Sequence, residues 1–134
     1  MSTRACIKVK ARMFLTDKDL MNQRRTPCEI ILYHHHDGYP SGVGSDLKKY
    51  LADNASNCGW WNPESIATDL VRGAIVDSEG LPDFGYKCAI AQHGDCDYGY
   101  LIDCDAKTLK CYRLGYEVMD WKEENLVEIP DKAA

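Results

Sequence analysis

The sequence predicts an α+β fold, with a mainly antiparallel sheet of about five strands and two helices packed on one face. Three observations predict it: a period-two pattern near the start, a capped helix after residue 62, and strand-like patterns on both sides of the helices without strict strand–helix alternation. With 45% hydrophobic and 28% charged residues, the chain has the composition of a folded protein. Its 134 residues fit one domain, with a core over about 4–118 and a polar tail over 119–134 that is expected to fray.

The first expected strand runs from Ala5 to Leu15, where every second residue is apolar. Residues 16–27 are expected to form a loop with room for one helical turn, and residues 28–33 a second strand that pairs antiparallel with the first. Residues 37–44 are so rich in turn-forming residues that a loop is expected there.

Two helices are expected next. Ser45 is a candidate N-cap for a helix that ends in the turn-forming residues 54–59. Asn62 as N-cap, with Pro63 at the first helical position, starts a second helix over about 63–76. Residues 86–116 are expected to form three strands, and residues 105–108 to close a hairpin between two of them.

The net charge of −5 and the sequence pI near 5.3 argue against charge-driven binding to nucleic acid. The sequence contains no apolar run long enough for a signal peptide or a membrane span. Seven cysteines without a Cys-x-x-Cys pair argue against a zinc ribbon or a disulfide framework. A cytoplasmic protein with small, buried, reduced cysteines is the interpretation that these features favour.

The run from His34 to His36, followed by Asp37, is the first candidate site. On a strand, His34 and His36 share one face while His35 points to the other. Two imidazoles and a carboxylate could hold a divalent metal, with His93 and Asp95 completing the ligand set if the two segments are neighbours. The favoured alternative is that these are polar side chains at a sheet edge, bonded to backbone or solvent.

The loop that leads into the expected first helix is the second candidate site. Its residues are Gly38, Tyr39, Gly42, Gly44 and Ser45. Glycines let backbone N–H groups approach a phosphate at a helix N-terminus, and this would suit an anionic nucleotide ligand. The spacing is neither that of a P-loop nor Gly-x-Gly-x-x-Gly, so a loop that only turns a corner is the favoured alternative.

Two further features have an ordinary explanation that is favoured over a functional one, and a third, the tryptophan pair, is ambiguous. A Cys96 nucleophile beside His93 is disfavoured because carboxylates flank the thiol. The cations of the first strand fit a solvated or edge strand protected from aggregation. Of Trp60 and Trp61, one is expected in the core and the other exposed as an interface anchor.

Three segments together resemble small uncharacterised phage and prophage proteins that carry a His-x-Asp-Gly-Tyr-Pro signature. They are His34–Gly44 with Leu47, then Ile66–Val71, then Gly94–Asp103. The resemblance covers about residues 28–112, with a histidine where these proteins have a tryptophan. It implies no established activity, but a phage context in which small proteins disable a host component or sequester a host nucleotide.

The leading functional hypothesis is therefore a non-enzymatic accessory or counter-defence protein in the host cytoplasm. It would bind a host protein or an anionic nucleotide through residues 34–45, with Trp61 nearby. The alternatives are a metal-dependent hydrolase or nuclease that uses the His/Asp cluster, and a structural subunit of an assembly. Whether the protein is an enzyme, and its oligomeric state, stay open at this point.

Overall fold

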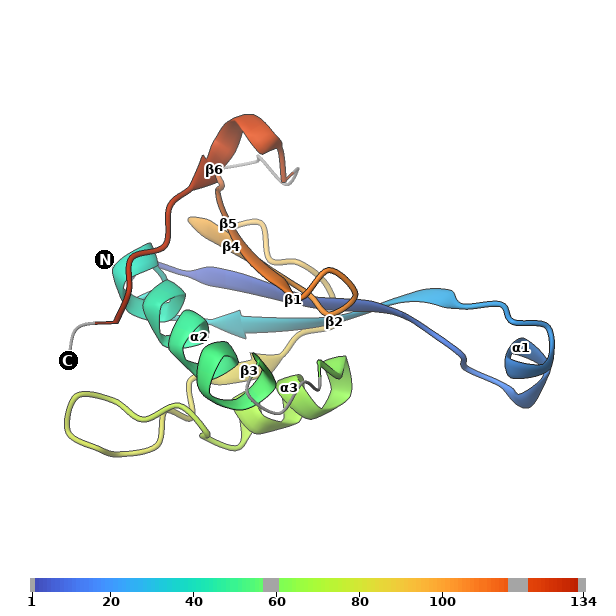
Figure 1. Cartoon of the computed structure of the whole chain (residues 1–134). Helices are drawn as coiled ribbons and strands as arrows, with labels where there is room; N and C mark the ends of the chain where they lie inside the picture. The colour runs from blue at the N-terminus through green and yellow to red at the C-terminus, as the bar shows by residue number, and fades with distance from the viewer. Residues whose placement is uncertain (1, 57–60, 116–120, 133–134) are drawn as a thin grey trace.

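A computed structural model of the chain, which describes residues 2–56, 61–115 and 121–132, shows a six-stranded mixed sheet with helices on one face (Figure 1). The spatial order is β3 (Tyr86–Cys88), β2 (Thr26–His34), β1 (Ala5–Met13), β4 (Tyr98–Asp103), β5 (Thr108–Arg113) and β6 (Leu126–Val127). The predicted α+β class is confirmed. In the described part of the chain, no helix is long and apolar enough to cross a membrane.

The central strand β1 has two different neighbours. It pairs antiparallel with β2, as predicted, and parallel with β4, with Ala5 opposite Tyr98. The other pairings are antiparallel, so the sheet is mainly antiparallel but contains a parallel pair that the sequence did not predict. The chain between β2 and β4 includes the main helices, which cover one face of the sheet (Figure 1).

The main helical segment begins earlier than predicted. A π-helical turn at Pro40–Gly44 leads into α2 (Ser45–Tyr50) and a second π-helical stretch at Leu51–Ser56. Ser45 is therefore not the predicted N-cap but an interior helical residue with φ −63°. Residues 40–44 were expected to be loop, and this expectation is wrong because Pro40 suits the first turn of a helix.

The second predicted helix is present as α3 (Pro63–Val71), and Asn62 caps it by accepting a hydrogen bond from Ser65 N at 3.0 Å. It ends before the predicted residue 76 because Gly73 has a φ of +86°, the left-handed conformation that stops a helix. The loop between β1 and β2 contains the short helix α1 (Asp17–Met21), as the sequence allowed.

The core lies between the sheet and the helices. Inward-facing Ile7, Leu32 and Tyr100 pack there with Leu47 and Leu70, all with 0% exposure. A smaller apolar cluster lies on the opposite face of the sheet. It is formed by Cys6, Cys96, Tyr112 and Leu114, with Trp121 and other partly buried residues beside them.

The tail from residue 121 does not fray as predicted. After a short turn at Glu123–Asn125, β6 pairs with Cys111 and Tyr112 of β5. The chain then crosses the start of α2, where Ser45 Oγ donates to the carbonyl of Pro130 at 2.8 Å. The prediction counted the acidic residues and gave no weight to Val127 and Ile129, which pack against the core.

The hairpin of β1 and β2 extends beyond the rest of the sheet. Pairing between β1 and β4 ends at Lys10 and Asp103, whereas β1 and β2 remain paired to Met13 and Thr26. We call residues 12–26 the arm. It projects from the body with α1 at its tip (Figure 1).

Candidate functional site

His34 is buried at the end of β2 and faces the helical layer, with 5% exposure. Its Nε2 lies 2.9 Å from Asp83 Oδ2 and its Nδ1 lies 2.5 Å from the carbonyl oxygen of His36. Both ring nitrogens therefore lie within hydrogen-bond distance of an oxygen of the protein. In this arrangement both nitrogens are engaged by protein partners rather than free to bind a metal.

His35 points to the opposite face, as predicted, and joins a different network. Its Nδ1 lies 2.9 Å from Tyr33 Oη and 3.4 Å from Arg4 Nε, so it acts as an acceptor and the neutral ring carries its proton on Nε2. Burial and the nearby Arg4 lower the pKa of His35. Arg4 also pairs with Asp95 at 3.4 Å, and the ring of His93 stacks on Tyr33 at a centroid distance of 4.2 Å.

The five predicted metal ligands are therefore not brought together. His36 is hydrogen bonded to Ser2 Oγ at 3.0 Å, and Asp37 accepts from Tyr39 Oη at 3.3 Å. Across residues 2–56, 61–115 and 121–132, no group of three or more His, Cys, Asp or Glu side chains is placed to hold a metal ion. The geometry thus does not supply the ligand set that a metal-dependent hydrolase needs.

The glycines of the second candidate site are explained by close packing of backbone. A Cβ on Gly38 would lie 2.8 Å from the carbonyl carbon of Arg4, and a Cβ on Gly42 would lie 2.3 Å from Asp37 O. Gly44 packs against Tyr100, whose hydroxyl donates to Gly38 O at 2.6 Å.

The backbone donors of this loop are also engaged. Gly42 N donates to Tyr39 O and Val43 N donates to Asp37 O, both at 2.9 Å, while Gly44 N reaches Tyr39 O at 3.5 Å. Free N–H groups are what makes a helix N-terminus attract a phosphate. Here these donors satisfy carbonyls of the loop itself. Tyr39, with 40% exposure, remains the accessible apolar side chain of the loop.

Cys96 lies in the small apolar cluster, where burial, Cys6 and Asp95 raise its pKa to about 12. Burial likewise raises the pKa of Cys6, Cys104 and Cys111 to about 11. A thiol with so high a pKa is protonated at neutral pH and is a poor nucleophile. The surroundings of Cys96 thus do not favour the thiolate that a nucleophile at this position would need.

We expect native protein treated with iodoacetamide at pH 8 to be alkylated at exposed Cys88 and to resist alkylation at these four buried thiols. Peptide mass spectrometry would locate the modified residues, with urea-unfolded protein as the control in which every cysteine reacts. Rapid alkylation of Cys96 in the native protein would contradict its protonated, buried state.

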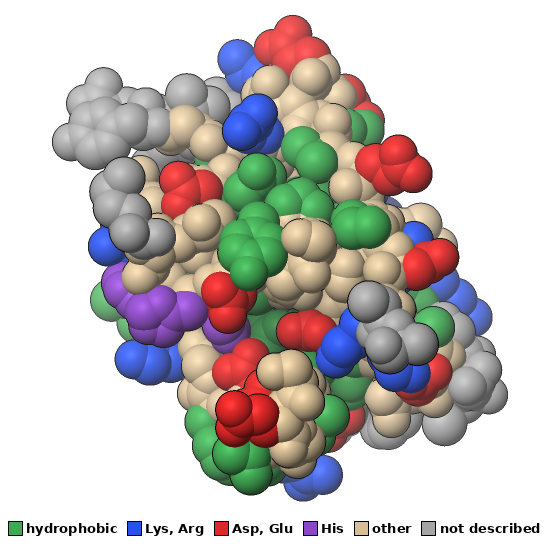
Figure 2. All heavy atoms as spheres, turned by 90° about the vertical axis from the view of Figure 1, so that its left-hand side faces the viewer, with side chains coloured by type: hydrophobic (Ala, Val, Ile, Leu, Met, Phe, Trp, Pro, Cys, Tyr) green, Lys and Arg blue, Asp and Glu red, His purple; other side chains and the backbone are tan. Residues whose placement is uncertain are grey.

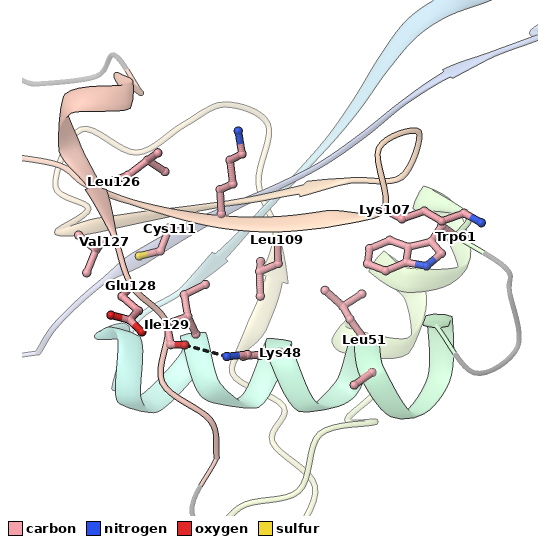
Figure 3. A pocket seen from close by; sticks show the side chains of 12 residues that line it. Lys48, Leu51, Trp61, Lys107, Leu109, Cys111, Leu126, Val127, Glu128 and Ile129 are labelled. Carbon is pink, nitrogen blue, oxygen red and sulfur yellow. Dashed lines mark hydrogen bonds between the residues drawn. The ribbon is translucent and has the colours of Figure 1, made fainter.

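Trp61 lies at one end of a groove between the main helical segment and the sheet edge at β5 and β6, while Trp60 lies outside the described residues. We call this cavity of about 610 Å³ the groove. Figure 3 shows the Trp61 indole beside Lys107 at one end and the hydrogen bond from Lys48 to the carbonyl of Ile129, 3.0 Å long, at the other. The lining combines polar and apolar surface, and its apolar part includes Leu51, Leu109, Cys111, Val127 and Ile129.

An open backbone edge borders the groove. Because β6 is short, it pairs only with Cys111 and Tyr112 of β5. In the part of the chain that the structure describes, no strand pairs with the outer edge of Thr108–Lys110. Such an edge offers N–H and C=O groups to a further strand.

Sequence reasoning identified only one residue of this groove, Trp61. The groove needs three segments that are distant in the chain: the helix end at Leu51, the strand residue Leu109, and the tail at Val127. The apolar alternation of Val127 and Ile129 is the sequence signal that could have indicated that the tail takes part.

Comparison of the chain with protein-family models, curated proteins and solved structures finds no match. The resemblance to phage and prophage proteins therefore stays a prediction from its motifs, and the argument for function depends on the geometry of the site.

Proposed function

We propose that this protein is a binding module that takes up an extended segment of a partner protein in the groove. The single observation that carries the proposal is that the open edge of β5 at Thr108–Lys110 borders a groove lined by both apolar and charged side chains. A peptide that adds to a sheet edge gains backbone hydrogen bonds, and pockets beside the edge select its side chains. Here one side of the added strand would face Leu51, Trp61 and Leu109.

The groove has the right size and composition for this role. Its volume of about 610 Å³ falls within the range of pockets that hold small ligands or a few side chains. Trp61 is half-buried, so its indole can cover an apolar side chain while remaining accessible. The tryptophan therefore serves as the interface anchor that the sequence suggested.

The charges beside the open edge favour an acidic segment. Lys107 and Lys110 are both exposed and flank Leu109 on β5 and its hairpin. Lys110 Nζ lies 3.6 Å from Glu123 Oε1, and an exposed ion pair of this kind contributes little to stability. Lys107 has no ion-pair partner among the described residues. Partner carboxylates at alternate positions could reach these amines.

The proposal retains the non-enzymatic binding role predicted from the sequence and moves the contact surface from residues 34–45 to the groove. A host protein as the partner, and an accessory or counter-defence role in a phage context, are what the resemblance adds to the proposal. The prediction of an anionic nucleotide ligand receives less support, because the donors of the glycine loop are engaged.

The experiment is fluorescence anisotropy with a labelled hexapeptide of alternating leucine and glutamate. We expect binding to the wild-type protein in the micromolar range, and at least a tenfold weaker affinity for Trp61→Ala, since anchor residues dominate such interfaces. Phe84→Ala is the matched control, because Phe84 is an exposed aromatic residue, 66% accessible, that does not line the groove.

A second probe tests the mode of binding. The same peptide with its backbone N–H groups methylated cannot pair with a strand edge, although its side chains are unchanged. We expect it to bind at least tenfold more weakly than the parent peptide. Equal binding of the two peptides, or unchanged binding by Trp61→Ala, would overturn the proposal.

A further inference from the structure

Two surfaces outside the groove expose clusters of large apolar side chains. On the arm they are Leu15, Leu20 and Met21, with exposures of 59%, 53% and 83%. On residues 76–84, which we call the acidic loop, they are Val76, Leu81 and Phe84, with exposures of 46%, 57% and 66%. Exposed apolar clusters of this kind mark interaction surfaces.

The two surfaces have opposite charge. The arm contains four cations, Arg12, Lys18, Arg24 and Arg25, and two carboxylates, Asp17 and Asp19. The acidic loop contains three carboxylates, Asp77, Glu79 and Asp83, and no lysine or arginine. The arm thus has a net charge of +2 (4 − 2) and the acidic loop one of −3, in a chain whose total is −5.

Local hydrogen bonds hold the acidic loop in shape. Asp77 Oδ1 accepts from Glu79 N at 2.8 Å and from Leu81 N at 3.0 Å, and Val76 forms a β-bridge with Pro82. The apolar side chains of the loop are therefore presented on a fixed backbone, which lowers the entropy cost of binding.

The arm is organised in a similar way. The β1–β2 ladder continues to Met13 and Thr26, and Thr16 caps α1 by accepting from Asp19 N at 3.0 Å. The guanidinium of Arg25 lies over the Phe14 ring at 4.8 Å. The tip of the arm can thus keep its shape when it meets a partner.

The two surfaces lie at opposite ends of the molecule (Figure 1). The end opposite the arm, seen face-on in Figure 2, has a central group of hydrophobic side chains with both acidic and basic side chains around it. One molecule cannot bring its own arm to its own acidic loop, whereas two copies can make this contact without any change of fold.

We propose that the arm of one molecule docks on the acidic loop of a second copy of the same chain. A second copy of the chain is the partner that these observations favour, because it offers both the opposite charge and an exposed apolar cluster to each surface. Because the two surfaces differ, the contact is heterologous, and repeated contacts give open chains or a closed ring. This inference is independent of the peptide groove.

The test measures association of the full chain by sedimentation velocity over a range of protein concentrations. We expect assemblies larger than a dimer at an ionic strength of about 0.05 M, and dissociation toward monomer at about 0.5 M, where exposed charges are screened. Trp61→Ala should associate like the wild type, and this result separates the contact from the groove.

Charge changes on each surface provide the decisive comparison: the arm variant reverses the arm from +2 to −2, and the loop variant neutralises the acidic loop from −3 to 0. The arm variant combines Lys18→Glu and Arg24→Glu, and the loop variant combines Ser78→Lys and Glu79→Lys. All four residues are exposed, and Asp77, Asp83 and Arg25, which shape the two surfaces, stay intact. Each variant alone should associate at least about tenfold more weakly than the wild type.

An equimolar mixture of the two variants should associate again, at least to a dimer, because the intact arm of the loop variant can then meet the intact acidic loop of the arm variant. Unfolded variants could not give this recovery. Glu124→Lys, a charge change on an exposed residue outside both surfaces, is the control that should behave like the wild type. A monomeric wild type at low salt, or a mixture that stays monomeric while the wild type assembles, would overturn the proposal.

Discussion

Gly42→Ala is expected to lower the free energy of unfolding by about 3 kcal/mol, at the upper end of the usual cost of overpacking. The new Cβ would lie 2.3 Å from Asp37 O, and this contact is with backbone that cannot rotate away. Relief of the clash must shift the turn that holds Val43 N on Asp37 O at 2.9 Å.

Urea denaturation followed by circular dichroism measures this change. Ser41→Ala is the matched control, because Ser41 lies next to Gly42 but is exposed. It should cost less than about 0.5 kcal/mol. If Gly42→Ala were as stable as the control, the close backbone contact could not be as the structure places it.

The same clash changes how binding data on this loop would have to be interpreted. A direct test of the nucleotide hypothesis would add a side chain at Gly42 or Gly44 and measure the loss of affinity. Since such a change is expected to disturb the fold itself, lost binding in a Gly42 variant would report reduced stability as readily as lost contact with a ligand.

The second large effect is expected at His34. We expect His34→Ala to lower the free energy of unfolding by about 3 kcal/mol, because it removes the hydrogen-bond partner of Asp83 Oδ2 and of the His36 carbonyl and also removes a buried ring. The carboxylate of Asp83 is 24% exposed, so solvent offsets part of the cost.

A double-mutant cycle of His34→Ala with Asp83→Asn measures how much the interaction between these two side chains contributes to the free energy of unfolding. The asparagine keeps an oxygen that can accept from Gly85 N, as Asp83 Oδ1 does at 2.7 Å. We expect a coupling of about 1 kcal/mol or more between the two positions. His36→Ala, at an exposed position, serves as the control. Additive effects of the two changes would show that His34 and Asp83 do not interact as the structure places them.

The features predicted correctly are those with a local cause. The alternation from Ala5 onward identified β1 and its buried face, and the Asn62-Pro63 signal located the start of α3, because period and capping act within a few residues. The antiparallel pairing of β1 and β2 also followed from their closeness in the chain.

The features that were missed depend on contacts between distant residues. The alternation of apolar residues in β1 does not predict that β4 will lie beside it, since a parallel partner strand can come from any later part of the chain. Gly42 lies in a segment whose composition is typical of a ligand-binding loop. Only the fold shows that Asp37 O occupies the space that a side chain at residue 42 would need. The histidine run gave no indication that Asp83 would engage His34.

The groove could not be predicted for the same reason. The sequence marks Trp61 as a candidate binding residue from its residue type and neighbours. Leu109 and the tail near Val127, which also line the groove, come from other parts of the chain. These segments come together only because β6 pairs with β5. The composition of the acidic tail does not predict that pairing.

The parallel pair of β1 and β4 also sets the order in which the molecule can fold. The β1–β2 hairpin can form as soon as its own residues are in place, since its contacts are local. One whole edge of β1 then remains unpaired until Tyr98 and the residues after it arrive, and contacts so distant in sequence form slowly. During that interval the strand with the most buried residues of the finished sheet is an edge strand, and Lys8, Lys10 and Arg12 are the residues that oppose its pairing with the wrong partner. These cations thus protect a strand that is central in the finished protein while it is still at the edge.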